Sequence, residues 1–159
     1  LPHSPGVEVS GTVEALGSGA SSPALEQRGV ASIGVNGCRP QVAIKASGAV
    51  PIPDGVSDET AAGIPVTYGT ALFGLKDRGR MKPGETIAVL GAAGGAGLAA
   101  VEIANLMGGR VVAVASSQDK LAVAKAHGAA EGIDYEFACG QANPTNAGTC
   151  DQPSAQRGR

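Results

Sequence analysis

The chain has 159 residues, a formal net charge of -2 and 43% hydrophobic residues. This length is that of about one domain, by the rough rule of ~150 residues each, and leaves little room for a two-domain enzyme. The small charge gives no electrostatic reason to expect a nucleic-acid partner. Aromatic residues make up only 3%, with no Trp, which argues against stacking platforms for single-stranded nucleic acid and suits a core of buried aliphatic strands.

No stretch of the sequence has the character of a membrane span, because the longest uncharged run, residues 86–101, is glycine-rich and shorter than the roughly 20 apolar residues required. The start at Leu1 has neither Met nor a secretory signal, so we interpret the sequence as a fragment. The cysteines Cys38, Cys139 and Cys150 are odd in number and lack CxxC spacing. They predict neither a disulfide framework nor a zinc site, and we expect a reducing, cytoplasmic compartment.

Candidate strands come first along the chain. Residues 7–16 alternate apolar and polar side chains, which is the period of a half-buried strand. A polar loop follows, and further strand-like stretches lie at residues 30–33 and 41–45. The N-terminal part is therefore expected to form short β-strands.

Helices are predicted after a turn at residues 51–55. Ser57 can cap a short helix whose first turn is acidic, where carboxylates favour the positive helix end. Pro65 is expected to interrupt this helix, and a second helical stretch covers roughly residues 68–77.

The sharpest boundary lies at residues 82–85, after which stretches of strand length and helix length alternate. Such alternation predicts a parallel sheet with right-handed crossovers. The expected elements are a strand at 86–90, a glycine turn at 91–97, a helix at 98–107, a strand at 110–115, a helix at 120–127 and the start of a strand at 133–135.

The last segment, residues 136–159, has a different composition. From Ala138 to Arg159 it contains no Val, Ile, Leu, Met, Phe, Tyr or Trp. Ordering a backbone costs roughly 1–2 kcal/mol per residue, and nothing in this composition offsets that cost. We therefore expect a disordered or off-pattern tail.

The glycine-rich turn is the motif that points to a ligand. Gly91, Gly94 and Gly97 lie three residues apart between a buried strand and a helix. Relative to the GxGxxG dinucleotide fingerprint, Gly94 and Gly97 supply the second and third glycines and Ala92 replaces the first. Residues without a Cβ let the backbone approach a pyrophosphate, and free N–H groups and the helix dipole face the anion. This context predicts a dinucleotide site, and a merely tight strand-to-helix turn is the alternative.

The end of the next strand indicates which dinucleotide is preferred. A site for NAD needs Asp or Glu there to bind the ribose 2′-OH, whereas this chain has Ala115, Ser116 and Ser117. Two hydroxyls at a helix N-terminus, with Lys120 one turn later, would hold a 2′-phosphate and so favour NADPH over NADH. The alternative is that a serine only caps the helix and that Lys120 is a solvated side chain.

Taken together, these residues resemble the zinc-free quinone oxidoreductases of the medium-chain dehydrogenase/reductase superfamily. The resemblance extends over about residues 1–135, and the turn in the form GAAGG-x-G is typical of that branch. The motifs that carry it are residues 5–13 (PGVEVSGTV), 51–55 (PIPDG), 61–62, 70–71, 82–85 (KPGE), 91–97, Lys120, 128–129 and 133–135.

The resemblance implies an α/β fold, with part of a GroES-like β domain for substrate at residues 1–56. Part of a Rossmann dinucleotide-binding domain, with a parallel sheet, would follow at residues 57–135. The implied activity is NADPH-dependent, zinc-independent reduction of a quinone or an α,β-unsaturated carbonyl by hydride transfer. No metal is expected, because Val7 stands where zinc-dependent relatives have a His ligand. No residue is assigned as catalytic.

The resemblance also implies which residues contact the cofactor, each at a place along one NADPH molecule. The expected positions are the pyrophosphate for Gly94, Gly95 and Ala96, the 2′-phosphate for Ser116, Ser117 and Lys120, the adenosine end for Tyr135, and the nicotinamide half for Thr70. Gly91, Ala93 and Gly97 of the same turn are also expected to bind the cofactor.

The expected partner is a small-molecule quinone or enone, with no nucleic acid and no membrane, and a homodimer is possible for the full-length family. The family pattern has further residues before Leu1 and continues after Tyr135, where this sequence departs from it, so we expect an incomplete copy. Two alternatives stay open. One is a non-catalytic nucleotide-binding remnant without a substrate pocket, and the other is an enoyl-thioester reductase of the same superfamily.

Overall fold

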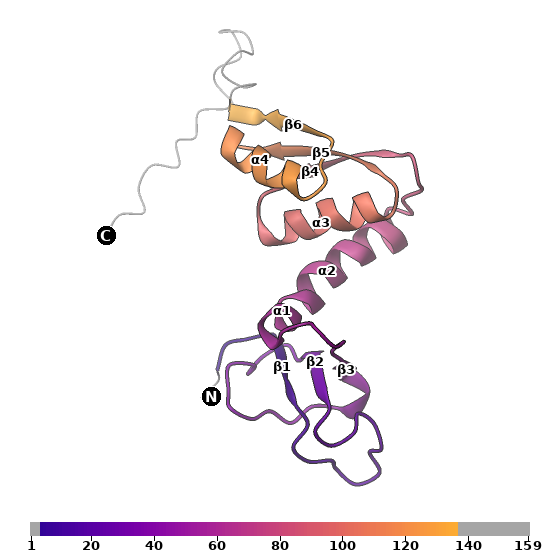
Figure 1. Cartoon of the computed structure of the whole chain (residues 1–159), viewed down its shortest axis with the longest axis vertical. Coiled ribbons are helices and arrows are strands. Elements are labelled where there is room, and N and C mark those ends of the chain that lie inside the picture. The colour runs from indigo at the N-terminus through magenta and orange to yellow at the C-terminus, as the bar shows by residue number, and fades with distance from the viewer. Residues whose placement is uncertain (1–3, 137–159) are drawn as a thin grey trace, which may run out of the picture. The chain divides into compact units, whose positions relative to one another are not determined.

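The computed structural model describes residues 4–136, which form helices and strands in both parts of the chain (Figure 1). The chain divides into two compact units, a first one that ends at Phe73 and a second one that begins at Gly74. The predicted α/β class is confirmed, since an antiparallel sheet belongs to the first unit and a parallel sheet to the second. The domain boundary at residue 57, which the resemblance implies, stays a prediction.

The first unit contains a three-stranded antiparallel sheet in the order β1-β2-β3, formed by Glu8–Thr12, Arg28–Ser32 and Val50–Pro51. Two of the predicted strand regions are therefore present, although the observed strands are short. The strand expected at residues 41–45 is wrong. Because β2 already pairs with β1 on one side and β3 on the other, residues 41–45 have no place beside it.

Two helices follow the sheet in this unit. The helix α1, Asp58–Ala62, begins as predicted, with the Ser57 Oγ accepting a hydrogen bond from the Thr60 backbone N at 3.2 Å. The helix α2 spans Ile64–Leu72, and a π-helical segment, Phe73–Arg78, continues it. Pro65 does not interrupt a helix but lies in the first turn of α2, where its missing N–H leaves no intrahelical bond unmade.

Arg28 links the sheet to the start of α1. Its Nη2 donates hydrogen bonds to the Asp58 Oδ1 at 2.8 Å and to the Val56 carbonyl at 2.7 Å, and its Nε donates to the same carboxylate at 3.1 Å. The side chains of Arg28 and Asp58 are 36% and 48% exposed. Solvent therefore weakens the ion pair, and the bond to a backbone carbonyl is the more robust part of the contact.

We expect Arg28→Met to lower the free energy of unfolding by about 1 kcal/mol, because it removes these bonds while keeping most of the aliphatic stem. Urea denaturation followed by circular dichroism measures the change. Arg39→Met is the matched control, since Arg39 is exposed and its Nη2 donates to one side chain, Asn36. Equal destabilisation by the two substitutions would contradict the role given to Arg28.

The second unit alternates strand and helix as predicted. Its elements are β4 (Thr86–Leu90), α3 (Gly95–Leu106), β5 (Arg110–Ala115), α4 (Gln118–Ala126) and β6 (Glu131–Asp134). The strands are parallel and lie in the order β4-β5-β6. All three carboxyl ends therefore meet at one edge, which is where ligands bind in open α/β sheets.

Small aliphatic residues form the core between this sheet and its two helices. Val101 on α3 and Val111 on β5 are the largest fully buried side chains. Alanines from α3, β5 and α4 are also buried, so the helices can approach the sheet closely. This packing fixes where the helix N-termini lie relative to the strand ends.

Within residues 4–136, no helix has the length and hydropathy to cross a membrane. The same residues contain no cluster of three or more His, Cys, Asp or Glu side chains that could hold a metal ion. Cys38 carries an exposed free thiol. Cys139, Cys150 and the predicted tail, apart from Glu136, lie outside the described residues.

Candidate functional site

The turn between β4 and α3 is built on backbone conformation. Gly91 has a φ of +64°, in the left-handed region that side chains disfavour. Its carbonyl accepts a hydrogen bond from the Gly94 N–H at 2.9 Å, which closes a tight turn. Gly94 is the N-cap of α3, and within residues 4–136 no side chain caps this helix. The first N–H groups of a 12-residue helix are therefore left to face an anion.

The glycines of this turn serve different purposes. A Cβ on Gly97 would lie 2.2 Å from the Gly91 carbonyl oxygen, so this position needs glycine for the packing of α3 against the turn. A Cβ on Gly94 would come no closer than 3.4 Å to that oxygen, and one on Gly95 would meet nothing within 4 Å. Since the chain itself does not require glycine at these two positions, their bare backbone leaves room for a ligand.

A cavity of about 370 Å³ lies at this edge of the parallel sheet. Its walls come from the β4–α3 turn, the end of β5, the first turn of α4 and the residue after β6. The residues that line it are Gly91, Ala93, Gly94, Ala115, Ser116, Lys120 and Tyr135.

The polar groups of the cavity are arranged around α4. The Lys120 Nζ donates a hydrogen bond to the Ser116 Oγ at 2.6 Å, and among the described lining residues Lys120 is the only charged one. The Ser117 Oγ instead accepts from the Lys120 backbone N at 3.4 Å and so caps α4. One serine thus faces the cavity beside a cation, while its neighbour has the capping role that the sequence left open.

The structure brings six of the predicted cofactor residues together in the cavity lining, and four others of the second unit lie outside that lining. Ala115, which the prediction missed, also lines the cavity, and its place at the carboxyl end of β5 is the signal that could have found it. Gly95, Ala96 and Gly97 lie in the first turn of α3 and Ser117 caps α4, outside the lining. Thr70 is exposed on α2, which belongs to the first unit.

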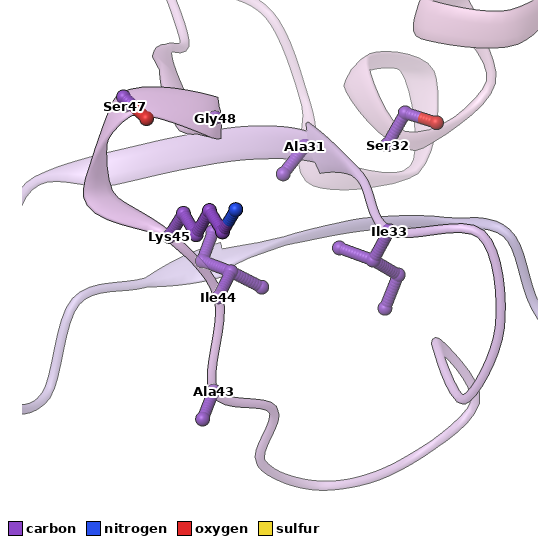
Figure 2. Close-up of a pocket in the computed structure, with 8 residues that line it drawn as sticks. All are labelled: Ala31, Ser32, Ile33, Ala43, Ile44, Lys45, Ser47 and Gly48. Atoms are coloured by element: carbon purple, nitrogen blue, oxygen red, sulfur yellow. The ribbon is translucent and has the colours of Figure 1, made fainter.

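A second cavity, of about 360 Å³, lies in the first unit and contains no predicted site residue (Figure 2). Ile33 and Ile44 give it aliphatic walls, and Lys45 is the only charged side chain among its described lining residues. The described residues that line it are Ala31, Ser32, Ile33, Ala43, Ile44, Lys45, Ser47 and Gly48. The cavity at the Gly91 turn is the stronger candidate, because it combines an uncapped helix N-terminus, a hydroxyl and a cation.

Comparisons with known proteins support the fold described above. No protein-family model matches the chain. Quinone oxidoreductase-like protein 2 of Bos taurus is 37% identical over 136 residues, which are 85% of this chain and 39% of the relative. The chain therefore spans about two fifths of the length of that curated relative.

Solved structures match both units. The quinone oxidoreductase of Thermus thermophilus, solved alone and with NADPH, is 39% identical with a TM-score of 0.72 over 86% of this chain and 42% of that one. The Escherichia coli quinone oxidoreductase complexed with NADPH is 28% identical with a TM-score of 0.80, over the same shares of the two chains. The antiparallel sheet thus corresponds to part of a GroES-like domain and the parallel sheet to part of a Rossmann domain. These matches confirm the resemblance of the chain, over about 85% of its length, to quinone oxidoreductases of the medium-chain dehydrogenase/reductase superfamily.

Proposed function

We propose that the protein binds NADPH at the cavity beside the Gly91 turn and takes part in zinc-independent reduction of a quinone or an α,β-unsaturated carbonyl. The observation that carries the proposal is the Lys120–Ser116 hydrogen bond in the wall of a cavity that also adjoins the uncapped start of α3. The cation and hydroxyl suit one phosphate group, and the helix start suits another.

Each part of the cavity would meet a different part of the cofactor. The N–H groups at the start of α3 would face the pyrophosphate, with Gly94 and Gly95 allowing its approach. Ser116 and Lys120 would bind the ribose 2′-phosphate. Because Ala115, Ser116 and Ser117 supply no carboxylate at the end of β5, an NAD-type contact to the 2′-OH is missing. These groups support a preference for NADPH over NADH.

NADPH supplies the hydride when it is bound, and the protein's part is to hold and orient it. The Thermus thermophilus and Escherichia coli relatives, whose structures contain NADPH, support transfer of this chemistry to the chain. The proposal assigns no catalytic side chain and no metal. A reducing, cytoplasmic setting belongs to the same proposal. A homodimer belongs to it as well.

A second candidate function is nucleotide binding without turnover. It is favoured by the described lining residues, which supply one cation, one hydroxyl and one phenol but no paired acid and base. Both candidate functions require NADPH binding. Only the first requires that added quinone or enone oxidise the bound cofactor.

The test is a titration of the purified chain with NADPH and with NADH, followed by nicotinamide fluorescence. We expect saturable binding, with NADPH bound about tenfold or more tightly, the value of one charge-assisted contact. A quinone is then added and loss of nicotinamide absorbance is measured. Equal affinity for the two cofactors would contradict the assignment of Ser116 and Lys120, and a folded chain that binds neither would refute the proposal.

Gly94→Ala provides a site-directed version of this test. A methyl group there is tolerated by the chain but occupies the surface that a pyrophosphate approaches, so NADPH affinity is expected to fall by about tenfold. Stability should stay within about 0.5 kcal/mol of the parent. Gly69→Ala is the matched control, since the added methyl meets nothing within 4 Å and Gly69, on α2, does not line the cavity. Unchanged affinity in Gly94→Ala would remove the pyrophosphate from this turn.

A further inference from the structure

One side-chain contact joins two walls of the cavity. The Gln118 Nε2 donates a hydrogen bond to the Asp134 Oδ2 at 3.2 Å. Gln118 is the first residue of α4, the helix that carries Lys120, and Asp134 is the last residue of β6, directly before Tyr135. Neither Gln118 nor Asp134 lines the cavity. Their contact ties the wall that contains Lys120 to the wall that contains Tyr135.

Asp134 also shapes the backbone that carries Tyr135. Its Oδ1 accepts a hydrogen bond from the Glu136 backbone N at 3.2 Å, and residues 135–136 are helical. This is the bond of an N-cap residue to the second residue of a helix. In the sheet register Asp134 lies opposite Ala115, which lines the cavity as Tyr135 does. The carboxylate therefore holds the chain at the point where Tyr135 leaves the sheet.

We propose that Asp134, held in place by Gln118, is a positioning residue that fixes the Tyr135 ring at the cavity for the incoming cofactor. The inference rests on the proposed NADPH site, although its first test needs no cofactor. Because Asp134 does not line the cavity, it acts through Tyr135. A ring that is held before binding loses less conformational freedom on binding, which raises affinity without a new contact.

Tyrosine fluorescence tests the positioning directly. The chain has two tyrosines and no Trp, so Tyr68→Phe leaves Tyr135 as the sole emitter. In that background, Asp134→Ala is expected to increase quenching of the emission by acrylamide. The increase is limited to about twofold, because Tyr135 is already 45% exposed. Asp134→Asn should resemble the parent, since its amide can still accept from Glu136 and pair with a flipped Gln118.

Gln118→Glu separates positioning from stability. A carboxylate in the first turn favours α4, but it opposes the Asp134 carboxylate and breaks the tie. We expect quenching to rise as in Asp134→Ala while the urea midpoint stays level or increases. Asp119→Ala is the control, because Asp119 lies in the same first turn and its loss should leave quenching unchanged. Parent-like quenching in both Asp134→Ala and Gln118→Glu would overturn the proposal.

NADPH titration of the Asp134 variants completes the test. Asp134→Ala is expected to weaken NADPH binding by about fivefold, the value of one ordinary hydrogen bond, and Asp134→Asn should bind like the parent. Gln118→Glu is left out of this titration, because its new carboxylate at the start of α4 would also repel the proposed 2′-phosphate. Raised quenching with unchanged NADPH affinity would also overturn the proposal. If the parent chain binds no NADPH, the proposed function fails, and the quenching series still decides whether Asp134 positions Tyr135.

Discussion

Gly97→Ala is expected to destabilise the second unit by about 3 kcal/mol or more. The added Cβ would lie 2.2 Å from the Gly91 carbonyl oxygen and 2.9 Å from the Ala92 Cα. Both neighbours are backbone atoms, so no side-chain rotation relieves the overlap, and α3 must move away from the turn. Overpacking of this kind commonly costs about 1–3 kcal/mol when the neighbours can adjust, and here they cannot without opening the strand-to-helix junction. Urea unfolding monitored by circular dichroism measures the loss.

Gly94→Ala and Gly95→Ala are the controls for this substitution. Gly94 has a φ of -81°, and neither added methyl group comes closer than 3.4 Å to another part of the chain. The free energy of unfolding of both variants should remain within about 0.5 kcal/mol of that of the parent. It can rise slightly, because Ala restricts the unfolded chain more than Gly does. If Gly97→Ala proved as stable as these two, the close approach of α3 to the Gly91 turn would be wrong.

Lys120→Glu is expected to lower NADPH affinity by about 100-fold and to leave NADH affinity nearly unchanged. The substitution removes the cation that donates to Ser116 at 2.6 Å and puts a carboxylate where the 2′-phosphate is proposed to bind. A hydrogen bond to a charged group is worth about 1.5–3 kcal/mol, or roughly 10- to 100-fold, and like-charge repulsion adds to the loss. Fluorescence titrations with the two cofactors, in the same buffer, measure the ratio.

Lys125→Glu is the matched control, since it makes the same change in net charge in the last turn of the same helix. It should leave both cofactor affinities near those of the parent. The free energy of unfolding should fall by a few tenths of a kcal/mol, because a negative charge at the end of α4 interacts unfavourably with the helix dipole. Raising the salt concentration should weaken NADPH binding more than NADH binding. An equal loss of NADPH affinity in the two variants would show that net charge, and not the Lys120 site, controls binding.

Local sequence patterns predicted much of the second unit. The apolar run before Gly91 and the run after Arg110 are observed as β4 and β5. Each run has the length of a strand and is followed by a residue typical of turns, Gly91 or Ser116. Local sequence patterns predicted the strands of the first unit less well. Residues 41–45 have strand-like composition but no strand conformation, since sheet pairing depends on which partner is available and not on composition alone.

The site shows the same division. From the spacing of its glycines and the absence of a carboxylate after β5, the sequence determined that the Gly91 turn and Ser116–Lys120 are candidates for a dinucleotide. Only the tertiary structure decided that Ser116 faces the cavity while Ser117 caps α4, and that Gly97 serves packing while Gly94 is open. It also decided that Gln118 meets Asp134. These outcomes depend on how close separate segments approach in space, and such distances are set by packing and not by local spacing along the chain.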